Sequence, residues 1–476
     1  MGHKDIDFRS IMSSVLYCFY DLDVSPASYD FLVFLQLAEL HRIRYGYDRI
    51  SFIFVPGSKD GFREDGLPKT TEQRSMMMRN VMMPSCRLLP SWIGTVWLSD
   101  RNEVEALLEK ANGHVFPRLY SLKRPVADYM WTGITAAYLR GESISLFKEP
   151  LEYTEMVKSY LRESSISEPR KVITVTVRET DYHKERNTNF SEWGPFLKEL
   201  PNEKYRVIIL PDTARVWSRN SFFDEFEHCQ MASIDVLFRV ALYRQADLNL
   251  AVNNGPVTLG SLTGSPTLIL KMASEDPASK PQWLKYILGI EFGDQFPMLK
   301  MNYRIAWGPE QKDFLLDQFN SYIDDFAELP SEAVVEHGIQ SDRQRKILCD
   351  NVWIYIRGRR MVFHANHIAQ EDVDSLESLV KHNPHFCEPK QLLGEIAVYA
   401  GHFDLALQLF NDCVQMSQHS GDEEMYKASR LMRIEVLAES GNMEEALKEG
   451  VELSNAYPED NEIINKVSSL RGYDML

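Results

Sequence analysis

The stretch that decides the fold is 246–270, which reads ADLNLAVNNGPVTLGSLTGSPTLIL. Residues 248–252 form an apolar run of strand length, and the turn at 253–256 cannot continue that strand because it contains glycine and proline. Residues 257–262 suit a short helix whose first free N–H groups point back at the turn, and a second strand closes the stretch. A strand, a polar glycine turn and a helix in this order are typical of a loop that binds an anion through backbone dipoles.

Apolar runs alternate with polar loops on both sides of this stretch, which predicts an α/β fold. In the first part of the chain the expected strands are 13–20, 50–55, 92–98 and 114–122, and the expected helices are 26–45 and 101–111. Ser25 and Pro26 suit the N-cap and the first position of the 26–45 helix. In the second part we expect strands at 172–177 and 206–210, and a helix at 311–327 that either closes this domain or returns to the first one. With a polar linker at 162–170, we predict two α/β domains, residues 1–165 and 166–330.

Residues 331–476 contain almost no strand signal, which predicts an all-α third domain. Part of this domain has the residue spacing of tetratricopeptide repeats. The matching positions are Leu393, Gly394, Gly401, Phe403, Ala406 and Phe410, with a partial second set at Gly441, Ala446 and Pro458. We therefore expect tetratricopeptide-like repeats, and a generic helical bundle is the alternative.

The charge balance limits the partners. The 476 residues include 52 Lys and Arg against 69 Asp and Glu, a formal net charge of −17. Such a chain is not expected to bind nucleic acid or an anionic membrane broadly, so an anionic substrate requires locally focused positive charge. The six cysteines are scattered and no segment resembles a signal peptide or a membrane span. We therefore expect reduced thiols and a cytoplasmic protein.

The loop at 177–187 is unusually dense in reactive side chains and directly follows an expected strand. Arg178 and Arg186 are suited to bind phosphate bidentately. Glu179, Asp181 and His183 offer acid or base groups at the carboxyl end of a strand, where open α/β sheets place their ligands. The alternative is a solvated loop whose charges pair with one another. Arg178 is the strongest candidate because it lies nearest the strand end.

The next strand-end loop contains Asp212 and Thr213, which are placed to contact a ribose or a base. An ordinary turn with a capping Asp gives the same pattern, so the turn explains it equally well. Only its position beside the two neighbouring loops favours a binding role.

The stretch 243–270 resembles the nucleotide-sugar site of GT-B glycosyltransferases, especially the heptosyltransferase type. The matching residues are Ala246, Asp247, Gly255, Pro256 and the helix that contains Leu259. Asn253 and Asn254 replace the family's acidic-serine pair, and Thr258 stands where its histidine would be. The resemblance implies two Rossmann-like domains of GT-B type before the helical domain. It also implies a donor site formed by Asn253, Asn254, Gly255, Pro256, Thr258 and Leu259.

The arginine-bearing loop is similar to that of the fucosyltransferase-like branch of GT-B enzymes, which implies that Arg178 stabilises a leaving diphosphate. Fixed arginine and backbone N–H groups can stabilise that charge without a metal. The base is then expected in the first domain, where Asp21 and Asp23 follow the first strand; His183 is the alternative base. The tripeptide 21–23 also matches the metal-binding Asp-x-Asp of GT-A transferases, but helix-entry carboxylates explain it better.

The leading interpretation is a cytoplasmic, metal-independent glycosyltransferase that moves a sugar from a nucleotide-sugar donor to a glycan or protein acceptor. The helical repeats are expected to recruit the acceptor or a protein partner. No cofactor and no metal are expected, because the nucleotide sugar is the substrate. Two other classes stay open: a GT-B-fold nucleotide-sugar epimerase or hydrolase, and a non-catalytic interaction protein.

Overall fold

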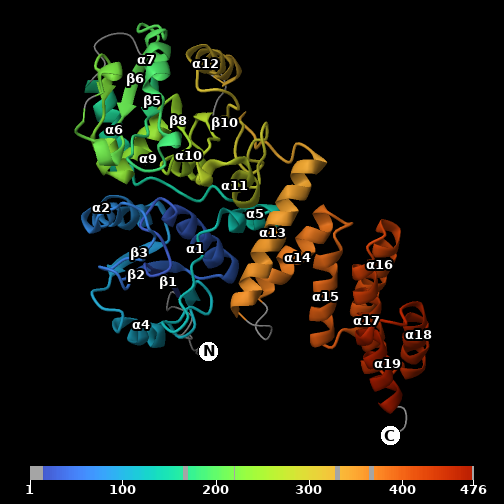
Figure 1. The fold of residues 1–476 in the computed structure, drawn as a ribbon. Helices are drawn as coiled ribbons and strands as arrows, with labels where there is room; N and C mark the ends of the chain where they lie inside the picture. Colours follow the sequence, from blue (N-terminus) through green and yellow to red (C-terminus); the bar gives the residue numbers. More distant parts are fainter. Residues whose placement is uncertain (1–13, 164–169, 219, 327–332, 364–368, 474–476) are drawn as a thin grey trace, which may run out of the picture. The chain divides into compact units, whose positions relative to one another are not determined.

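The computed structural model describes residues 14–163, 170–218, 220–326, 333–363 and 369–473. It divides into two compact units, Met1–Leu348 and Cys349–Leu476, and each is described separately (Figure 1). Most of the linker expected at 162–170 lies outside the described residues. None of the described helices is both long and apolar enough to cross a membrane.

The first sheet of the larger unit is parallel and has the order β3-β2-β1-β4. Its strands are β1 (Val15–Asp21), β2 (Arg49–Val55), β3 (Trp92–Trp97) and β4 (Val115–Phe116). All four lie in the expected runs, although β4 covers only the start of the 114–122 run. The other elements of this part are α1 (Phe31–Tyr45), α2 (Thr71–Met77), η2 (Met78–Met82), α3 (Met83–Ser85), η3 (Cys86–Leu88), α4 (Glu103–Ala111), α5 (Trp131–Leu139) and α6 (Leu151–Glu163).

Helix α1 begins at Phe31, later than the start that Ser25 and Pro26 predict. The carbonyl of Asp21 accepts the N–H groups of Val24 (3.2 Å) and Ser25 (2.8 Å), which closes a tight turn directly after β1. The chain therefore reaches helical geometry only after this turn, and the prediction of the helix start is wrong. The end of the helix at Gly46, in left-handed conformation with φ 72°, is as predicted.

The second sheet is also parallel, with the order β10-β9-β8-β5-β6-β7. Its strands are β5 (Lys171–Thr176), β6 (Tyr205–Leu210), β7 (Glu227–His228), β8 (Leu248–Val252), β9 (Thr267–Lys271) and β10 (Tyr303–Ile305). The predicted strands at 172–177, 206–210 and 248–252 are confirmed. Buried parallel strands have continuous apolar runs, so the sequence signal was clear.

Helices cover both faces of the second sheet (Figure 1). Helices α7 (Phe190–Lys198) and α12 (Lys312–Phe326) contact each other and share a core with one face. Leu315, Phe319 and Tyr322 of α12 are buried in that core, so this helix closes the second domain. The opposite face carries α9 (Val236–Gln245) and α10 (Val257–Thr263). The remaining short elements are η4 (Lys184–Arg186), η5 (Thr213–Arg215), η6 (Ser221–Phe223), α8 (Met231–Ile234), η7 (Pro277–Ser279), α11 (Pro281–Trp283) and η8 (Leu284–Leu288).

The smaller unit is helical throughout its described residues. Helix α13 (Asp342–Phe363) leads into it, followed by α14 (Gln370–His382), α15 (Cys387–Tyr399), α16 (Phe403–Ser420), α17 (Glu423–Glu439), α18 (Met443–Ala456) and α19 (Asn461–Tyr473). Gly394 of α15 lies against the Phe410 ring of α16, where a Cβ on residue 394 would come within 2.8 Å of ring carbons. Ala406 is fully buried beside Phe410. These helices therefore pack closely at positions of the repeat pattern.

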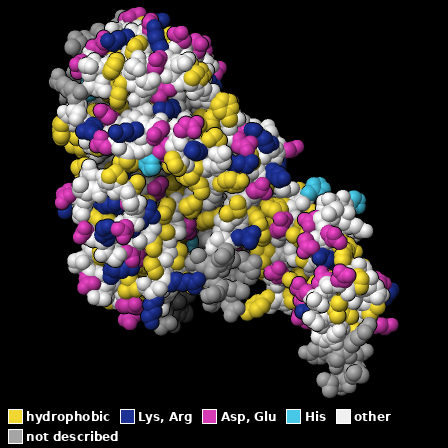
Figure 2. All heavy atoms as spheres, viewed as in Figure 1, with side chains coloured by type: hydrophobic (Ala, Val, Ile, Leu, Met, Phe, Trp, Pro, Cys, Tyr) yellow, Lys and Arg dark blue, Asp and Glu magenta, His cyan; other side chains and the backbone are white. Residues whose placement is uncertain are grey.

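On the face shown in Figure 2, the Lys and Arg side chains of the described residues are interspersed with Asp and Glu. This mixture agrees with the acidic composition.

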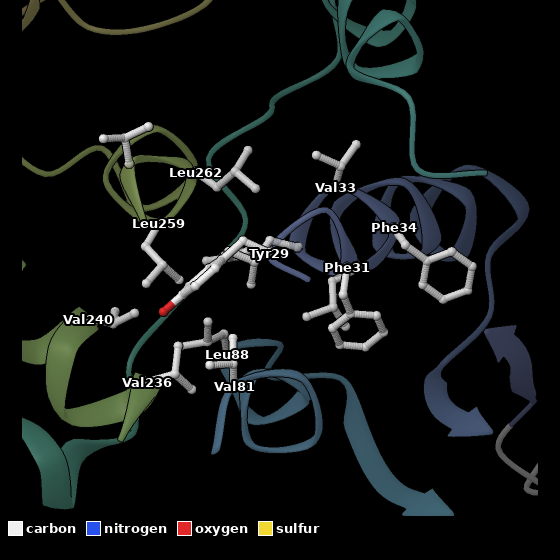
Figure 3. Close-up of a cluster of buried hydrophobic side chains, with 14 of the residues drawn as sticks. Tyr29, Phe31, Val33, Phe34, Val81, Leu88, Val236, Val240, Leu259 and Leu262 are labelled. Atoms are coloured by element: carbon white, nitrogen blue, oxygen red, sulfur yellow. The ribbon is translucent and has the colours of Figure 1, made fainter. Parts of the chain in front are cut away.

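One hydrophobic core joins the two sheet-containing lobes of the larger unit, which we call the amino-terminal lobe (14–163) and the carboxyl-terminal lobe (170–326). Figure 3 shows Tyr29 extending from the amino-terminal lobe toward Leu259 of α10 and Val240 of α9. A Cβ added to Gly255 would meet the Tyr29 ring at 2.6 Å, so Tyr29 packs directly on the glycine of the 253–256 turn.

Candidate functional site

Both sheets reverse their strand order at the strand that precedes the predicted site residues. In the second sheet, β5 lies between β6 and β8, so the chain moves outward in opposite directions from this point. The loops after β5 and β8 therefore border the crevice in which open α/β sheets bind ligands. In the first sheet, β1 lies between β2 and β4, and Asp21 ends that strand.

Arg178 follows β5 at this switch point and is 5% exposed. Its Nη1 donates to the carbonyl of His183 (2.9 Å) and to the side-chain oxygen of Asn187, and its guanidinium lies 5.7 Å from the centre of the Tyr182 ring. All of these partners are neutral. Burial lowers the pKa of Arg178 from its ordinary value, which shows that its charge is poorly solvated.

Arg186, on the same loop, is held in a similar way. Its Nη2 donates to the carbonyl of Asn253 (3.2 Å), while its Nε is buried without a hydrogen-bond partner among the described residues. Burial first, and then the positive charge of Arg178, lower the pKa of Arg186. The two guanidinium groups are therefore close enough to repel each other.

Neither arginine forms an ion pair with a described carboxylate. Lys271, at the end of β9, differs because its Nζ is 2.8 Å from Glu310 Oε2. A cation held away from water without a carboxylate partner is costly, so buried Arg178 and half-buried Arg186 together at a switch point favour a bound anion. In a chain of net charge −17, this arginine pair is the focused positive charge that an anionic substrate requires.

His183 lies beside the arginine pair and contacts a carboxylate from another loop. Its Nδ1 is 2.6 Å from Oδ2 of Asp276, which follows β9 and is 2% exposed. Asp276 is fixed in turn, because its Oδ1 accepts the N–H of Ala278 (2.9 Å) and its own N–H donates to Ser274 Oγ (3.2 Å). The negative charge of Asp276 also acts on both Arg178 and Arg186.

The 253–256 turn differs from the open anion cradle that the sequence predicts. Helix α10 has only 7 residues, and Asn254 Oδ1 already accepts the N–H of Val257 (3.3 Å). Tyr29 packs on Gly255, and Leu259 is fully buried in the core between the lobes. The side chain of Leu259 is therefore a packing residue, and only its main chain could contribute to a donor site.

The other donor-site candidates in this turn differ in role. Asn253 supplies the carbonyl that accepts from Arg186, so it orients that side chain. Pro256 occupies the N-cap position of α10. Thr258 is half-buried, and its carbonyl accepts from Ser261 Oγ (2.9 Å).

Asp212 and Thr213 hold the loop after β6. Asp212 accepts the N–H of Ala214 (3.0 Å) and that of Glu179 (3.2 Å), so it caps its own turn and joins the β6 loop to the β5 loop. Thr213 Oγ1 donates to the carbonyl of Ser233 (2.9 Å) and bonds the hydroxyl of Tyr29. Asp212 therefore acts as the capping residue of an ordinary turn, which was the alternative to a binding role.

Two carboxylates of the β5 loop have different surroundings. Arg215 Nη2 donates to both carboxylate oxygens of Asp181 (2.8 and 2.9 Å), and the Asp181 side chain is 79% exposed. Asp181 therefore matches the alternative of a solvated loop whose charges pair with one another, and we do not propose a catalytic role for it. The side chain of Glu179 is half-buried and has no hydrogen-bond or ion-pair partner among the described residues. Glu179 thus stays a candidate.

Asp21 is a structural carboxylate. It is fully buried, and Arg101 donates to both of its oxygens (2.7 and 2.8 Å). Tyr120 donates a further hydrogen bond to Oδ2 (2.7 Å), and the N–H of Asp23 binds Oδ1 (3.0 Å). A carboxylate with both oxygens engaged in an ion pair is poorly placed to accept a proton, so we drop Asp21 as the base.

Asp23 has one oxygen engaged. Its Oδ1 accepts the N–H (2.8 Å) and the hydroxyl (2.6 Å) of Ser58. These two bonds lower the pKa of Asp23, the hydroxyl having the larger effect. Within the described ranges no partner contacts Oδ2. Asp23 is thus ionised at neutral pH with an available oxygen, although its lowered pKa makes it a weaker base.

Within the described part of the chain, no three His, Cys, Asp or Glu side chains come together as a set of metal ligands. The carboxylates of the Asp-x-Asp tripeptide are divided between Arg101 and Ser58.

The sequence interpretation missed four residues of this region. Asp276 follows β9 just as Arg178 follows β5, so its strand-end position was the available signal. Lys69 of the amino-terminal lobe, two residues before α2, lies 5.3 Å from the centre of the Tyr182 ring. Tyr29 and the fully buried Arg239 interact electrostatically with each other and with Asp212. No local motif marks these three.

No family model matches the chain, and no curated protein matches it in sequence. Among solved structures, E. coli ADP-heptose LPS heptosyltransferase II has a TM-score of 0.39 and 10% identity, with 66% of this chain and 99% of that chain covered. The family 9 glycosyl transferase from Veillonella parvula has a TM-score of 0.37 and 9% identity, covering 73% and 97%. E. coli heptosyltransferase WaaC with ADP has a TM-score of 0.33 and 11% identity, covering 66% and 98%. Similarities of this size carry no inference about activity, so function is argued from the site geometry.

Proposed function

We propose that the protein is a glycosyltransferase that binds a nucleotide-sugar donor at Arg178 and Arg186. The observation that carries the proposal is the pair of adjacent guanidinium groups of buried Arg178 and half-buried Arg186, without a described carboxylate partner, at the switch point of a parallel sheet. Arginine forms planar, bidentate contacts with phosphate, so two arginines suit the two phosphates of a nucleoside diphosphate.

The chemistry follows from this charge. Glycosyl transfer leaves a negative charge on the departing diphosphate, and fixed donors stabilise that charge without reorganising. In this proposal the transfer needs no divalent metal, because the arginine pair supplies the compensating charge. The carbonyl of Asn253 and the side chain of Asn187 orient the two guanidinium groups.

We assign the acceptor to the amino-terminal lobe, with Asp23 as the base for an acceptor hydroxyl. The hydroxyl belongs to a glycan or a protein. The Ser58 hydrogen bonds hold Asp23 ionised and leave Oδ2 available. Glu179 of the facing lobe is the second candidate base.

The helical unit is proposed to consist of tetratricopeptide-like repeats that recruit the acceptor or a protein partner. The close contact of Gly394 with Phe410 and the burial of Ala406 support this assignment. Tyr399 and Leu405 are exposed apolar side chains of this unit, 76% and 49% exposed. They are therefore available to a partner. The free state of all six cysteines agrees with the cytoplasmic location that we propose.

The donor assignment is tested by calorimetric titration with a panel of nucleoside diphosphates and nucleotide sugars. Losing one charge-assisted contact costs about 1.5–3 kcal/mol, so Arg178→Ala and Arg186→Ala are each expected to weaken binding by roughly 10- to 150-fold. Arg178→Lys is expected to recover part of the loss. Arg215→Ala is the matched control, because Arg215 pairs with exposed Asp181 on the neighbouring loop. Tight binding that is unchanged in Arg178→Ala, Arg186→Ala and Thr258→Val refutes the site.

Product analysis without an acceptor separates the alternative classes. Epimerised or released sugar at turnover rates points to an epimerase or hydrolase. No binding of any nucleotide by the wild-type chain points to an interaction protein.

A further inference from the structure

Asp276 and His183 form a contact that the proposed binding of the nucleotide-sugar donor does not require. The 2.6 Å contact joins Nδ1 of His183 to Oδ2 of a carboxylate that is 2% exposed, so the imidazole is oriented from one side. His183 itself is 32% exposed, and no described residue bonds its Nε2. A carboxylate that orients a histidine while the other ring nitrogen stays available is the arrangement of an acid or base catalyst.

The backbone conformation of His183 also supports a functional role for this residue. His183 adopts φ 51°, a left-handed conformation that is uncommon for residues other than glycine. This conformation is held by the loop, since the carbonyl of His183 accepts from Arg178 Nη1 (2.9 Å). The histidine is thereby tied to the diphosphate-binding arginine by its own main chain. Strain of this kind concentrates at functional sites.

Charged groups of both lobes lie at or near the loop that carries His183. The β5 loop contributes Arg178 and Arg186, together with Tyr182, whose ring centre lies 5.4 Å from that of His183. The loop after β9 contributes Asp276. The amino-terminal lobe contributes Lys69 over Tyr182, and Asp30, whose charge acts on Arg186. Asp276 is the one carboxylate in contact with the ring among the described residues.

We propose that His183, positioned by Asp276, is the proton donor to the departing diphosphate. This role rests on the proposed glycosyltransferase function and adds a catalytic residue to it. The location supports an acid on the donor side, because His183 shares its loop with both phosphate-binding arginines and lies in the same lobe.

The bond between the anomeric carbon and the phosphate oxygen breaks, and its electron pair stays on that oxygen. The proton on His183 Nε2 passes to the same oxygen, which leaves a neutral imidazole whose Nδ1–H remains on Asp276. The acceptor oxygen bonds the anomeric carbon, and its proton passes to the Asp23 carboxylate. Both residues then exchange their protons with water.

The test compares His183→Asn with Lys184→Ala in the full chain, using the donor identified by calorimetry. Asparagine tolerates the left-handed backbone, so His183→Asn is expected to fold. Lys184 is an exposed residue on the same turn and serves as the matched control. General acid catalysis contributes about 10²- to 10⁴-fold, so His183→Asn should lower kcat by that factor while Lys184→Ala stays within about 2-fold of wild type. The Kd for the nucleoside diphosphate should change by less than about 10-fold in both variants.

A double-mutant comparison tests the role of Asp276 as a positioning residue. In Asp276→Asn the imidazole loses the carboxylate that holds its Nδ1, so kcat should fall while the Kd for the nucleoside diphosphate changes by less than about 10-fold. In the His183→Asn background, Asp276→Asn should lower kcat no further, because there is no imidazole left to orient. A purely structural role of Asp276 would lower kcat in both backgrounds.

Two results overturn the proposal and separate it from the proposed function. If His183→Asn keeps the rate of Lys184→Ala, the histidine is not the acid, while the glycosyltransferase function stands. If the wild-type chain transfers no sugar from any donor, both are refuted.

Discussion

Replacing Gly255 by alanine tests the contact that joins the two lobes. The added Cβ would lie 2.6 Å from Cδ2 of Tyr29 and 2.9 Å from its Cβ and Cγ. Carbon atoms normally pack at about 3.5–4.0 Å, so one of the two residues must move by about 1 Å. Tyr29 is 9% exposed and is surrounded by side chains of both lobes (Figure 3), so the ring has little room.

Overpacking of this kind costs about 1–3 kcal/mol. A loss of unfolding free energy lowers the melting temperature in proportion to it. We therefore expect the melting temperature of Gly255→Ala to fall by roughly 2–10 °C in differential scanning calorimetry. Gly94→Ala is the control within the same unit, because the nearest heavy atom to its added Cβ is Ser51 Oγ at 4.0 Å. That variant should melt within about 1 °C of wild type.

The cause is identified by a double-mutant cycle with Tyr29→Ala. This substitution alone should cost about 3–5 kcal/mol, because it empties a core position. With the ring removed, Gly255→Ala should add almost nothing, which gives a coupling of about 1–3 kcal/mol. If Gly255→Ala lowers the melting temperature equally in both backgrounds, or has no effect in the wild type, the explanation through Tyr29 is refuted.

Two further predictions concern other parts of the chain. In the helical unit, Gly394→Ala would place a Cβ 2.8 Å from the Phe410 ring, so we expect a loss of about 1–3 kcal/mol in urea unfolding that Phe410→Leu relieves; additive effects would contradict it. In the larger unit, burial lowers the pKa of His337, whose Nε2 lies 2.9 Å from the carbonyl of Tyr303. Protonation is therefore unfavourable in the folded state, so stability is fully present above pH about 6.5 and is lost as the pH falls through the lowered folded-state pKa. His337→Gln should remove this part of the pH dependence in thermal melts from pH 7.5 to 5, and an unchanged slope would count against it.

Most strands of the larger unit could be predicted from the sequence because they are continuous apolar runs, whereas β7 and β10, with two and three residues, are too short to give this signal. The start of α1 could not, because the turn that delays it is made by main-chain bonds to the carbonyl of Asp21. The end of the same helix could, since Gly46 acts locally.

The candidate site shows the same division between local and distant effects. The position of Arg178 and Arg186 in the loop after β5 could be predicted, because the apolar run of that strand ends directly before it. The ion pair of Asp21 depends on Arg101, which is distant in sequence, and the burial of Leu259 depends on packing between lobes. The contact of His183 with Asp276 depends on neighbouring β5 and β9 loops, which no spacing rule connects.

The arginine pair in an acidic chain has a consequence for the speed at which the proposed donor would bind. A donor with a charged diphosphate is repelled by the net charge of −17 while it is far away and attracted only near the two guanidinium groups. At physiological ionic strength the field is screened beyond about 8 Å, so the repulsion fades while the short-range attraction remains. Added salt should therefore accelerate association of the donor at first, the reverse of electrostatic steering.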